Sequence, residues 1–96
     1  MIKVKIKDNK INVTGHANYA DFGKDIVCAS VSSVLICTIN GILSIDKEAI
    51  LVEEKEANVT IEIKKDNEII NKLINNMIDC FKELEINYPN NIKIIQ

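Results

Sequence analysis

The chain has 96 residues, enough for one domain with a thin hydrophobic core, and we expect residues 1–96 to form that single domain. All twelve basic residues are Lys and the formal net charge is −2, so the basic surplus and the arginine side chains that favour direct nucleic-acid binding are missing. Hydrophobic residues make up 47% of the chain and charged residues 27%, which excludes an intrinsically disordered protein.

The cysteines and the N-terminus indicate a reducing compartment. Three cysteines, an odd number, do not fit a disulfide framework, and the N-terminus alternates Lys with apolar residues where a signal peptide would have an apolar run. We therefore expect free thiols in a cytoplasmic protein. A single histidine and the absence of a CxxC motif do not fit a zinc site or a thiol redox protein, so we expect no metal and no cofactor.

The first part of the chain has the pattern of a β-hairpin followed by a loop. Apolar residues alternate with lysines over residues 2–7, as in a half-buried strand. The alternation resumes after the turn pair Asp8-Asn9, whose residue types tolerate a positive φ. Residues 15–24 contain two glycines and no sustained period, which predicts a loop.

Residues 26–45 form an uncharged run of twenty, and Asp25 before it is a good helix N-cap. The length alone would allow a membrane span. The Ser, Thr, Asn and Gly residues within the run, and the aspartates that flank it, favour a helix of a soluble domain instead. We expect this helix to be buried on most sides, with one face on a sheet and another on a partner, and we expect no membrane contact.

A second hairpin and a second helix follow. The hairpin is predicted over residues 49–63, and Asp66 or Asn67 caps the next helix, which ends before Pro89. The helix has an apolar stripe with a spacing of three and four residues: Ile70, Leu73, Ile74, Met77, Ile78, Phe81 and Leu84. Residues 92–95 suggest a last short strand.

The predicted element order is therefore β-β-α-β-β-α-β. Strands and helices come in groups, which indicates an α+β fold of two layers. We expect a mixed or antiparallel sheet covered by two helices.

One pair of residues is suited to nucleophilic chemistry. Cys28 lies in the first turn of the predicted helix, where free N–H groups and the helix dipole favour a thiolate. The same N–H groups could hold the oxyanion of an attacked carbonyl. His16 is the only imidazole in the chain, and the loop can fold it back onto Cys28. A nucleophile and a nearby base are the minimum set for a cysteine hydrolase.

Each of these residues also has a purely structural interpretation. Cys28 could be a small buried hydrophobe and His16 a solvated loop residue. Asp25 could serve as a helix cap alone, or its carboxylate could also orient His16. Ser32 shares a helix face with Cys28, and its hydroxyl could bond the carbonyl four residues earlier.

The other cysteines and the loop side chains remain open to two interpretations. Cys37 and Cys80 lie among core-like residues, and we assign both to packing. Tyr19, Asp21 and Phe22 could gate or contact a ligand. Alternatively, Tyr19 and Phe22 anchor the loop on the core.

Several residues of the loop and the following helix form a specific motif: Gly15-His16-Ala17, Gly23, Asp25-Ile26-Val27-Cys28-Ala29 and Val31-Ser32. This motif, with a spacing of twelve from His16 to Cys28, resembles the signature of the Prp family of small bacterial ribosomal-processing cysteine proteases. Tyr88-Pro89 after the second helix is similar as well, and the resemblance covers essentially the whole chain.

The resemblance implies the site residues. Carried over by position, Cys28 is the nucleophile and His16 is the general base and later the acid. The supporting motif positions are Gly15, Asp25 and Ser32. The substrate loop contains Tyr19, Asp21, Phe22 and Gly23, and its sequence NYADF differs from the typical pattern.

The resemblance also implies a substrate. Family members remove a short N-terminal extension from a large-subunit ribosomal protein and cut just after an aromatic residue. They form homodimers through helices. The alternative function, which the residues leave open, is a non-catalytic ribosome-associated homodimer that binds a peptide in the same cleft.

Overall fold

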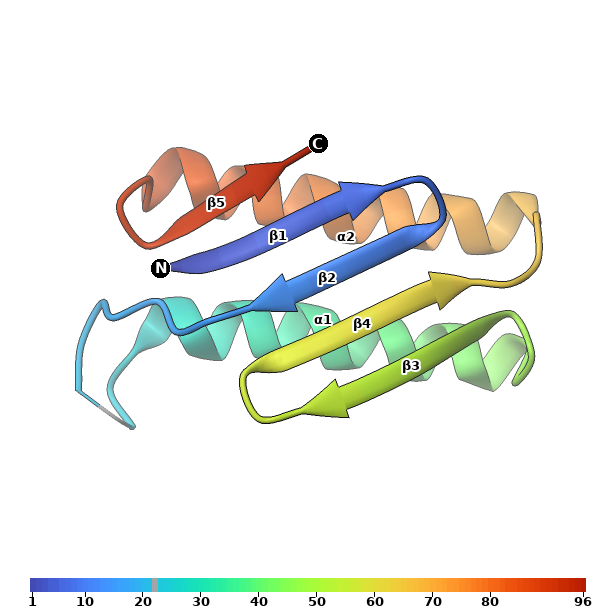
Figure 1. The fold of residues 1–96 in the computed structure, drawn as a ribbon, viewed down its shortest axis with the longest axis horizontal. Coiled ribbons are helices and arrows are strands. Elements are labelled where there is room, and N and C mark those ends of the chain that lie inside the picture. Colours follow the sequence, from blue (N-terminus) through green and yellow to red (C-terminus); the bar gives the residue numbers. More distant parts are fainter. Residues whose placement is uncertain (22) are drawn as a thin grey trace.

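The computed structural model describes residues 1–21 and 23–96. Its elements follow the predicted order along the chain (Figure 1): β1 (Ile2–Lys7), β2 (Lys10–Thr14), α1 (Ile26–Ile45), β3 (Ile50–Lys55), β4 (Asn58–Ile63), α2 (Glu68–Asn87) and β5 (Ile92–Ile95).

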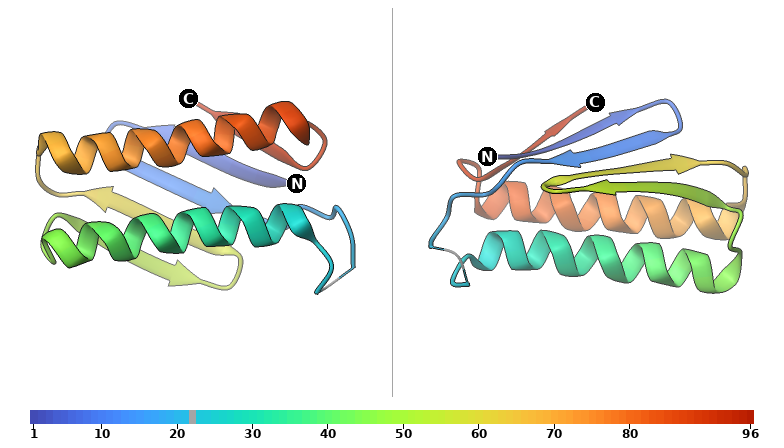
Figure 2. Two further views of the ribbon diagram at one scale, coloured as in Figure 1. Left: turned by 180° about the vertical axis from the view of Figure 1, so that it is seen from behind. Right: turned by 60° about the horizontal axis from the view of Figure 1, so that its bottom comes forward.

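The strands form one sheet of five in the order β3-β4-β2-β1-β5. Strands β1 and β5 run parallel and the other neighbouring pairs are antiparallel, so the sheet is mixed. Both helices cover the same face of the sheet, side by side (Figure 2). The α+β fold of two layers is therefore confirmed.

Tight turns fix the register of both hairpins. Lys7 pairs with Lys10 across β1 and β2, and Asp8 in the turn between them has a φ of 54°, the positive value that its residue type tolerates. Lys55 pairs with Asn58 across β3 and β4. A slip by one residue would turn every core side chain to the open face, so these turns determine which residues are buried.

Helix α2 begins where its cap dictates. The side chain of Asn67 accepts hydrogen bonds from the N–H groups of Ile69 and Ile70, which identifies Asn67 rather than Asp66 as the N-cap. The helix ends before Pro89, as predicted. Its apolar stripe faces the sheet and α1, and the charged residues lie on the opposite side.

The core lies between the helices and the sheet. Phe81 and Met77 of α2 are fully buried in it, as are Val27 and Ile42 of α1. Burying a side chain of this size contributes about 1.5–3 kcal/mol to folding. The inward residues of the strands complete this cluster: Ile2, Val4, Ile11, Val13, Ile50, Ile61 and Ile92.

The outer face of α1, which we expected a partner to cover, is open in the single chain. Ile26 and Ile36 are 51% and 53% exposed. Cys37 is exposed on this helix too, so its assignment to packing was wrong, whereas Cys80 on α2 is partly buried. Helix α1 is long and apolar enough to cross a membrane, a test that core helices of soluble proteins also pass.

One edge of the sheet is covered by a side chain. Strand β5 lies at this edge, and the N–H of Ile94 donates a hydrogen bond of 2.7 Å to a carboxylate oxygen of Glu85. Glu85 belongs to the last turns of α2, so the helix occupies a backbone donor of the edge strand.

Candidate functional site

The first turn of α1 is organised by Asp25. Its Oδ1 accepts hydrogen bonds from the N–H groups of Val27 (3.0 Å) and Cys28 (2.9 Å), and its Oδ2 accepts one from the N–H of Tyr19 (3.0 Å). The predicted N-cap is thus confirmed. The bond from the Cys28 N–H is the main cause that lowers the pKa of the Asp25 carboxyl, and the bond from Tyr19 adds to it.

Because of these bonds, the first-turn N–H groups of α1 are not free to donate to the sulfur or to a substrate oxyanion, although we had expected them to be. The N–H groups of Val27 and Cys28 are engaged by Asp25, and the N–H of Ala29 donates to the Asp25 carbonyl. First-turn amides that we expected to face a substrate oxyanion are therefore occupied within the helix. The carboxylate also offsets part of the positive end of the helix dipole.

A loop amide reaches the sulfur instead. Cys28 is partly buried, and its Sγ accepts a hydrogen bond of 3.2 Å from the N–H of Ala17. Ala17 itself is buried, with 1% of its surface exposed. The loop therefore places one backbone donor on the sulfur, independently of the amides at the helix start.

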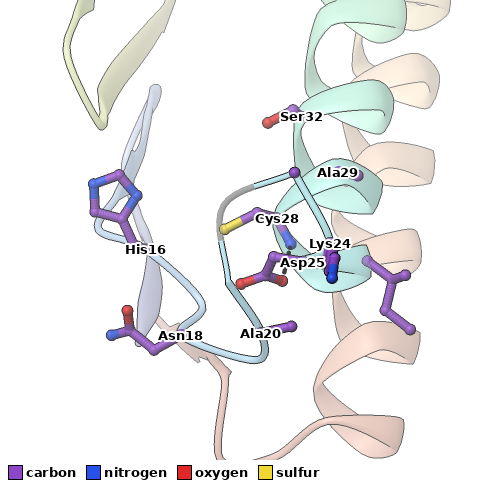
Figure 3. A pocket seen from close by; sticks show the side chains of 10 residues that line it. His16, Asn18, Ala20, Lys24, Asp25, Cys28, Ala29 and Ser32 are labelled. Atoms are coloured by element: carbon purple, nitrogen blue, oxygen red, sulfur yellow. Dashed lines mark hydrogen bonds between the residues drawn. The ribbon is translucent and has the colours of Figure 1, made fainter.

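His16 and Cys28 open into the same cleft. The cleft has a volume of about 560 Å³, and the sulfur points towards the wall that carries the exposed imidazole (Figure 3). Among the described residues no hydrogen bond joins the two side chains. The residues that line the cleft are His16, Asn18, Ala20, Gly23, Lys24, Asp25, Ile26, Cys28, Ala29 and Ser32.

A second hollow lies on the other side of the same residues. It has a volume of about 290 Å³ and is also lined by His16, Cys28 and Ser32. Its far wall is the end of the β3–β4 hairpin, with Glu54 and Lys55. A chain that passes over Cys28 would therefore have space on both sides of the sulfur.

Ser32 lies one turn beyond Cys28, as its spacing predicts (Figure 3). Within the described part of the chain its exposed hydroxyl has no hydrogen-bond partner. We considered a hydrogen bond from Ser32 to the carbonyl four residues earlier. Ser30 makes a bond of this kind instead, since its hydroxyl donates to the carbonyl of Ile26 at 2.7 Å. Ser32 thus keeps its hydroxyl available to a molecule in the cleft.

Gly15 and Gly23 have φ values of +92° and +83°, which other residues rarely adopt. At Gly15 a Cβ would lie only 2.5 Å from the carbonyl oxygen of Met1. The glycine before the histidine is therefore required by the fold, whatever its part in catalysis.

The substrate-loop residues differ in their positions. The ring of Tyr19 packs edge-on against Tyr88, with 5.4 Å between ring centroids and an interplanar angle of 84°. Tyr19 and Asp21 do not line the cleft, whereas Gly23 does. The contact with Tyr88 favours the anchoring interpretation of Tyr19. Phe22 lies outside the described residues.

Sequence reasoning missed several residues of the site. Ala17 bonds the sulfur, and Asn18, Ala20 and Lys24 line the cleft. Asn91 reaches the loop from the far end of the chain, where its Nδ2 donates to the carbonyl of Ala17 at 3.0 Å. No local pattern marks a backbone amide or a distant asparagine as part of a site.

Known proteins resemble this chain over almost its whole length. The model of the family "Cysteine protease Prp" matches residues 1–93. The ribosomal processing cysteine protease Prp of Mycoplasma genitalium is 30% identical over 96 residues, which cover 98% of this chain and 94% of that protein. The Prp of Staphylococcus aureus strain Mu50 is 25% identical, over 92% and 86% of the two chains.

The fold is shared with solved structures. A crystal structure of S. aureus Prp with a covalently linked product peptide has a TM-score of 0.88 and 23% identity, over 98% of this chain and 95% of that one. A second S. aureus Prp structure, with a substrate peptide, has a TM-score of 0.81 and 22% identity, over 97% and 94%. The family match decides between the two functions that the residues left open, in favour of the enzyme. The chain belongs to the family of cysteine protease Prp and is a cysteine protease.

Proposed function

We propose that this protein removes the N-terminal extension of a large-subunit ribosomal protein and cuts after an aromatic residue. The observation that carries the proposal is the shared cleft, into which both Cys28 and His16 open. The relatives' function as ribosomal processing proteases supports the substrate class. The three free thiols fit a reaction in the cytoplasm, where cysteines stay reduced.

The proposed chemistry uses the two side chains in sequence. His16 accepts the thiol proton of Cys28, and the thiolate attacks the carbonyl carbon of the scissile peptide bond. The carbonyl electron pair moves to oxygen and returns as the C–N bond breaks, while protonated His16 gives its proton to the leaving amine. Water, activated by His16, then hydrolyses the thioester and restores the thiol.

The cleft supports the preference for an aromatic residue. Ala20, Ile26 and Ala29 give the wall beside Cys28 small and apolar side chains, and the volume of about 560 Å³ can hold an aromatic ring with its backbone. Lys24 and Asn18 add polar groups to the lining of the cleft, where they can bond an extended peptide.

His16 must approach Cys28 before a proton can move. We infer that the loop of residues 15–24 orders around a bound peptide and that the His16 side chain turns towards Cys28, while Ala17 keeps its bonds to Cys28 and Asn91. Hydrogen exchange of residues 17–24, with and without a substrate peptide, tests this step. Protection should rise when peptide is bound, and equal protection in both states would refute the ordering of the loop.

The decisive experiment is cleavage of the N-terminal peptide of the same organism's ribosomal protein, read by mass. Cys28→Ala should abolish cleavage while its circular dichroism spectrum stays unchanged. His16→Ala should lower the rate by about 10²–10⁴-fold or more. The matched control is Cys37→Ala, which removes an exposed thiol outside the cleft and should cleave normally. Cleavage by Cys28→Ala would remove Cys28 from the mechanism.

The outer face of α1 supports a homodimer. The helix carries no charge over twenty residues, and Ile26 and Ile36 are half-exposed on it. We expect Ile36→Asp to convert a dimer into a monomer in analytical ultracentrifugation. Ile86→Asp is the control, because Ile86 is 76% exposed but lies on α2. A dimer that survives Ile36→Asp would exclude this face.

A further inference from the structure

The turn between α2 and β5 holds the active-site loop at two points. Asn91 donates from Nδ2 to the carbonyl of Ala17 at 3.0 Å, across 74 positions of sequence. Three residues earlier, the ring of Tyr88 packs edge-on against Tyr19. The loop that carries His16 is thus attached to the turn between α2 and β5 as well as to the start of α1.

The bond from Asn91 acts on the residue that faces the sulfur. Ala17 receives the Asn91 side chain on its carbonyl, and its own N–H donates to Cys28 Sγ. The two peptide groups on either side of one Cα turn only through φ and ψ of that residue. Because the Ala17 side chain is also buried, fixing its carbonyl limits the directions in which its N–H can point.

This N–H is the donor that the described structure offers to the sulfur. The amides of Val27 and Cys28, which would otherwise support a thiolate at the helix start, are bonded to Asp25. The sulfur therefore depends more on the orientation of the Ala17 N–H here than it would in a site whose first-turn amides were free.

We propose that Asn91 is a positioning residue for the protease reaction, which acts through Ala17 to keep a backbone N–H aimed at Cys28 Sγ. This proposal rests on the proposed role of Cys28 as nucleophile. Asn91 does not touch the sulfur, and its effect is to hold a hydrogen-bond donor on the atom from which attack begins.

A substitution at Asn91 can separate this role from its part in the fold. The backbone of Asn91 makes its own bonds, since its carbonyl accepts from the N–H of Ile2 at 2.9 Å and its N–H donates to the carbonyl of Tyr88 at 3.0 Å. These bonds remain when the side chain changes. Asn91→Ala removes the side-chain donor, and Asn91→Asp puts a carboxylate oxygen in its place, which repels the Ala17 carbonyl.

The test measures the rate at which iodoacetamide alkylates Cys28 in the folded protein at pH 7, with the products separated by peptide mass from those of Cys37 and Cys80. In both Asn91 variants this rate should fall about tenfold, because the N–H of Ala17 is no longer held on the sulfur. Peptide cleavage should lose kcat to a similar extent with little change in KM. Asn90→Ala, a change at the neighbouring exposed residue, should match the unmodified protein.

An alkylation rate of Cys28 in the Asn91 variants that matches the unmodified protein would overturn the proposal, whatever happens to cleavage or to the melting temperature. A purely structural role would lower the melting temperature and leave the alkylation rate of the folded protein unchanged. The proposed function fails on a separate result, namely cleavage by Cys28→Ala, and the alkylation rate does not depend on that result.

Discussion

The three glycines of the chain offer a test of the active-site loop, since the same Gly→Ala change should have a different effect at each. Gly15 combines a φ of +92° with a Cβ position 2.5 Å from the carbonyl oxygen of Met1. Gly23 has a φ of +83°, and among the described residues, its chain neighbours aside, no atom lies within 4 Å of its Cβ position. Gly41 lies inside α1, in ordinary helical conformation and with open space around it.

The expected free energies of unfolding follow from these geometries. Holding an alanine in the left-handed backbone conformation costs about 1–2 kcal/mol of folding free energy. A backbone carbonyl that must move aside for its methyl group adds about 1–3 kcal/mol. Alanine also restricts the unfolded chain, which offsets about 0.4–1 kcal/mol. Gly15→Ala should therefore destabilise the protein by about 2–4 kcal/mol and Gly23→Ala by about 1 kcal/mol or less. Gly41→Ala should stabilise it by about 0.5–1 kcal/mol.

Urea unfolding monitored by circular dichroism measures all three differences. The proteins should be compared at one concentration, because dimerisation would make the stability depend on it. Equal losses for Gly15→Ala and Gly23→Ala would show that the Met1 carbonyl does not approach Gly15 as described. A loss for Gly41→Ala would show that this part of α1 has no room for a methyl group.

Three further predictions concern the pH dependence and the core. The pKa of Asp25 is lowered below its ordinary 3.8, chiefly by the N–H of Cys28. The stability that the Asp25 carboxylate contributes is therefore present above about pH 4 and is lost as the pH falls through the pKa of Asp25 in the folded protein. Asp25→Asn should remove this loss in melting curves recorded down to about pH 2. The pKa of Asp46 is lowered chiefly by its hydrogen bond with Lys65, so Lys65→Met should move the NMR titration of the Asp46 carboxyl upward, and an unmoved titration would exclude that pair. Phe81→Ala should cost about 3–5 kcal/mol in urea unfolding, because the ring is fully buried, and a loss below 1 kcal/mol would contradict its place in the core.

The local features of this fold are readable from the sequence because they depend on neighbouring residues. The alternation in β1 and the stripe of α2 predict which face of each element is buried, and both predictions are confirmed. The direction of β5 was left open. It runs parallel to β1, since the chain crosses the sheet through α2 before it pairs. Such pairing depends on contacts across the whole chain, which no local pattern records.

The local part of the site was also predictable from the sequence. The spacing places Cys28 in the first turn of a capped helix, and the cap at Asp25 is confirmed. Two further features depend on side-chain and loop geometry that the sequence does not record. Asp25 occupies the N–H of Cys28, and the N–H of Ala17 donates to the Cys28 sulfur instead. The exposure of Cys37 was missed because α1 carries no charge, although Ser33, Asn40 and Ser44 lie on the same outward face at helical spacing.

The carboxylate of Glu85 on the N–H of Ile94 also has a consequence for contacts between whole molecules. A sheet with two open edges can add copies without limit, whereas here the β5 edge carries a charged oxygen at a backbone donor. Strand β3 is left as the edge to which another extended chain can join. Two copies that paired through β3 would present a β5 edge at each end, where the occupied donor at Ile94 disfavours the addition of a further strand.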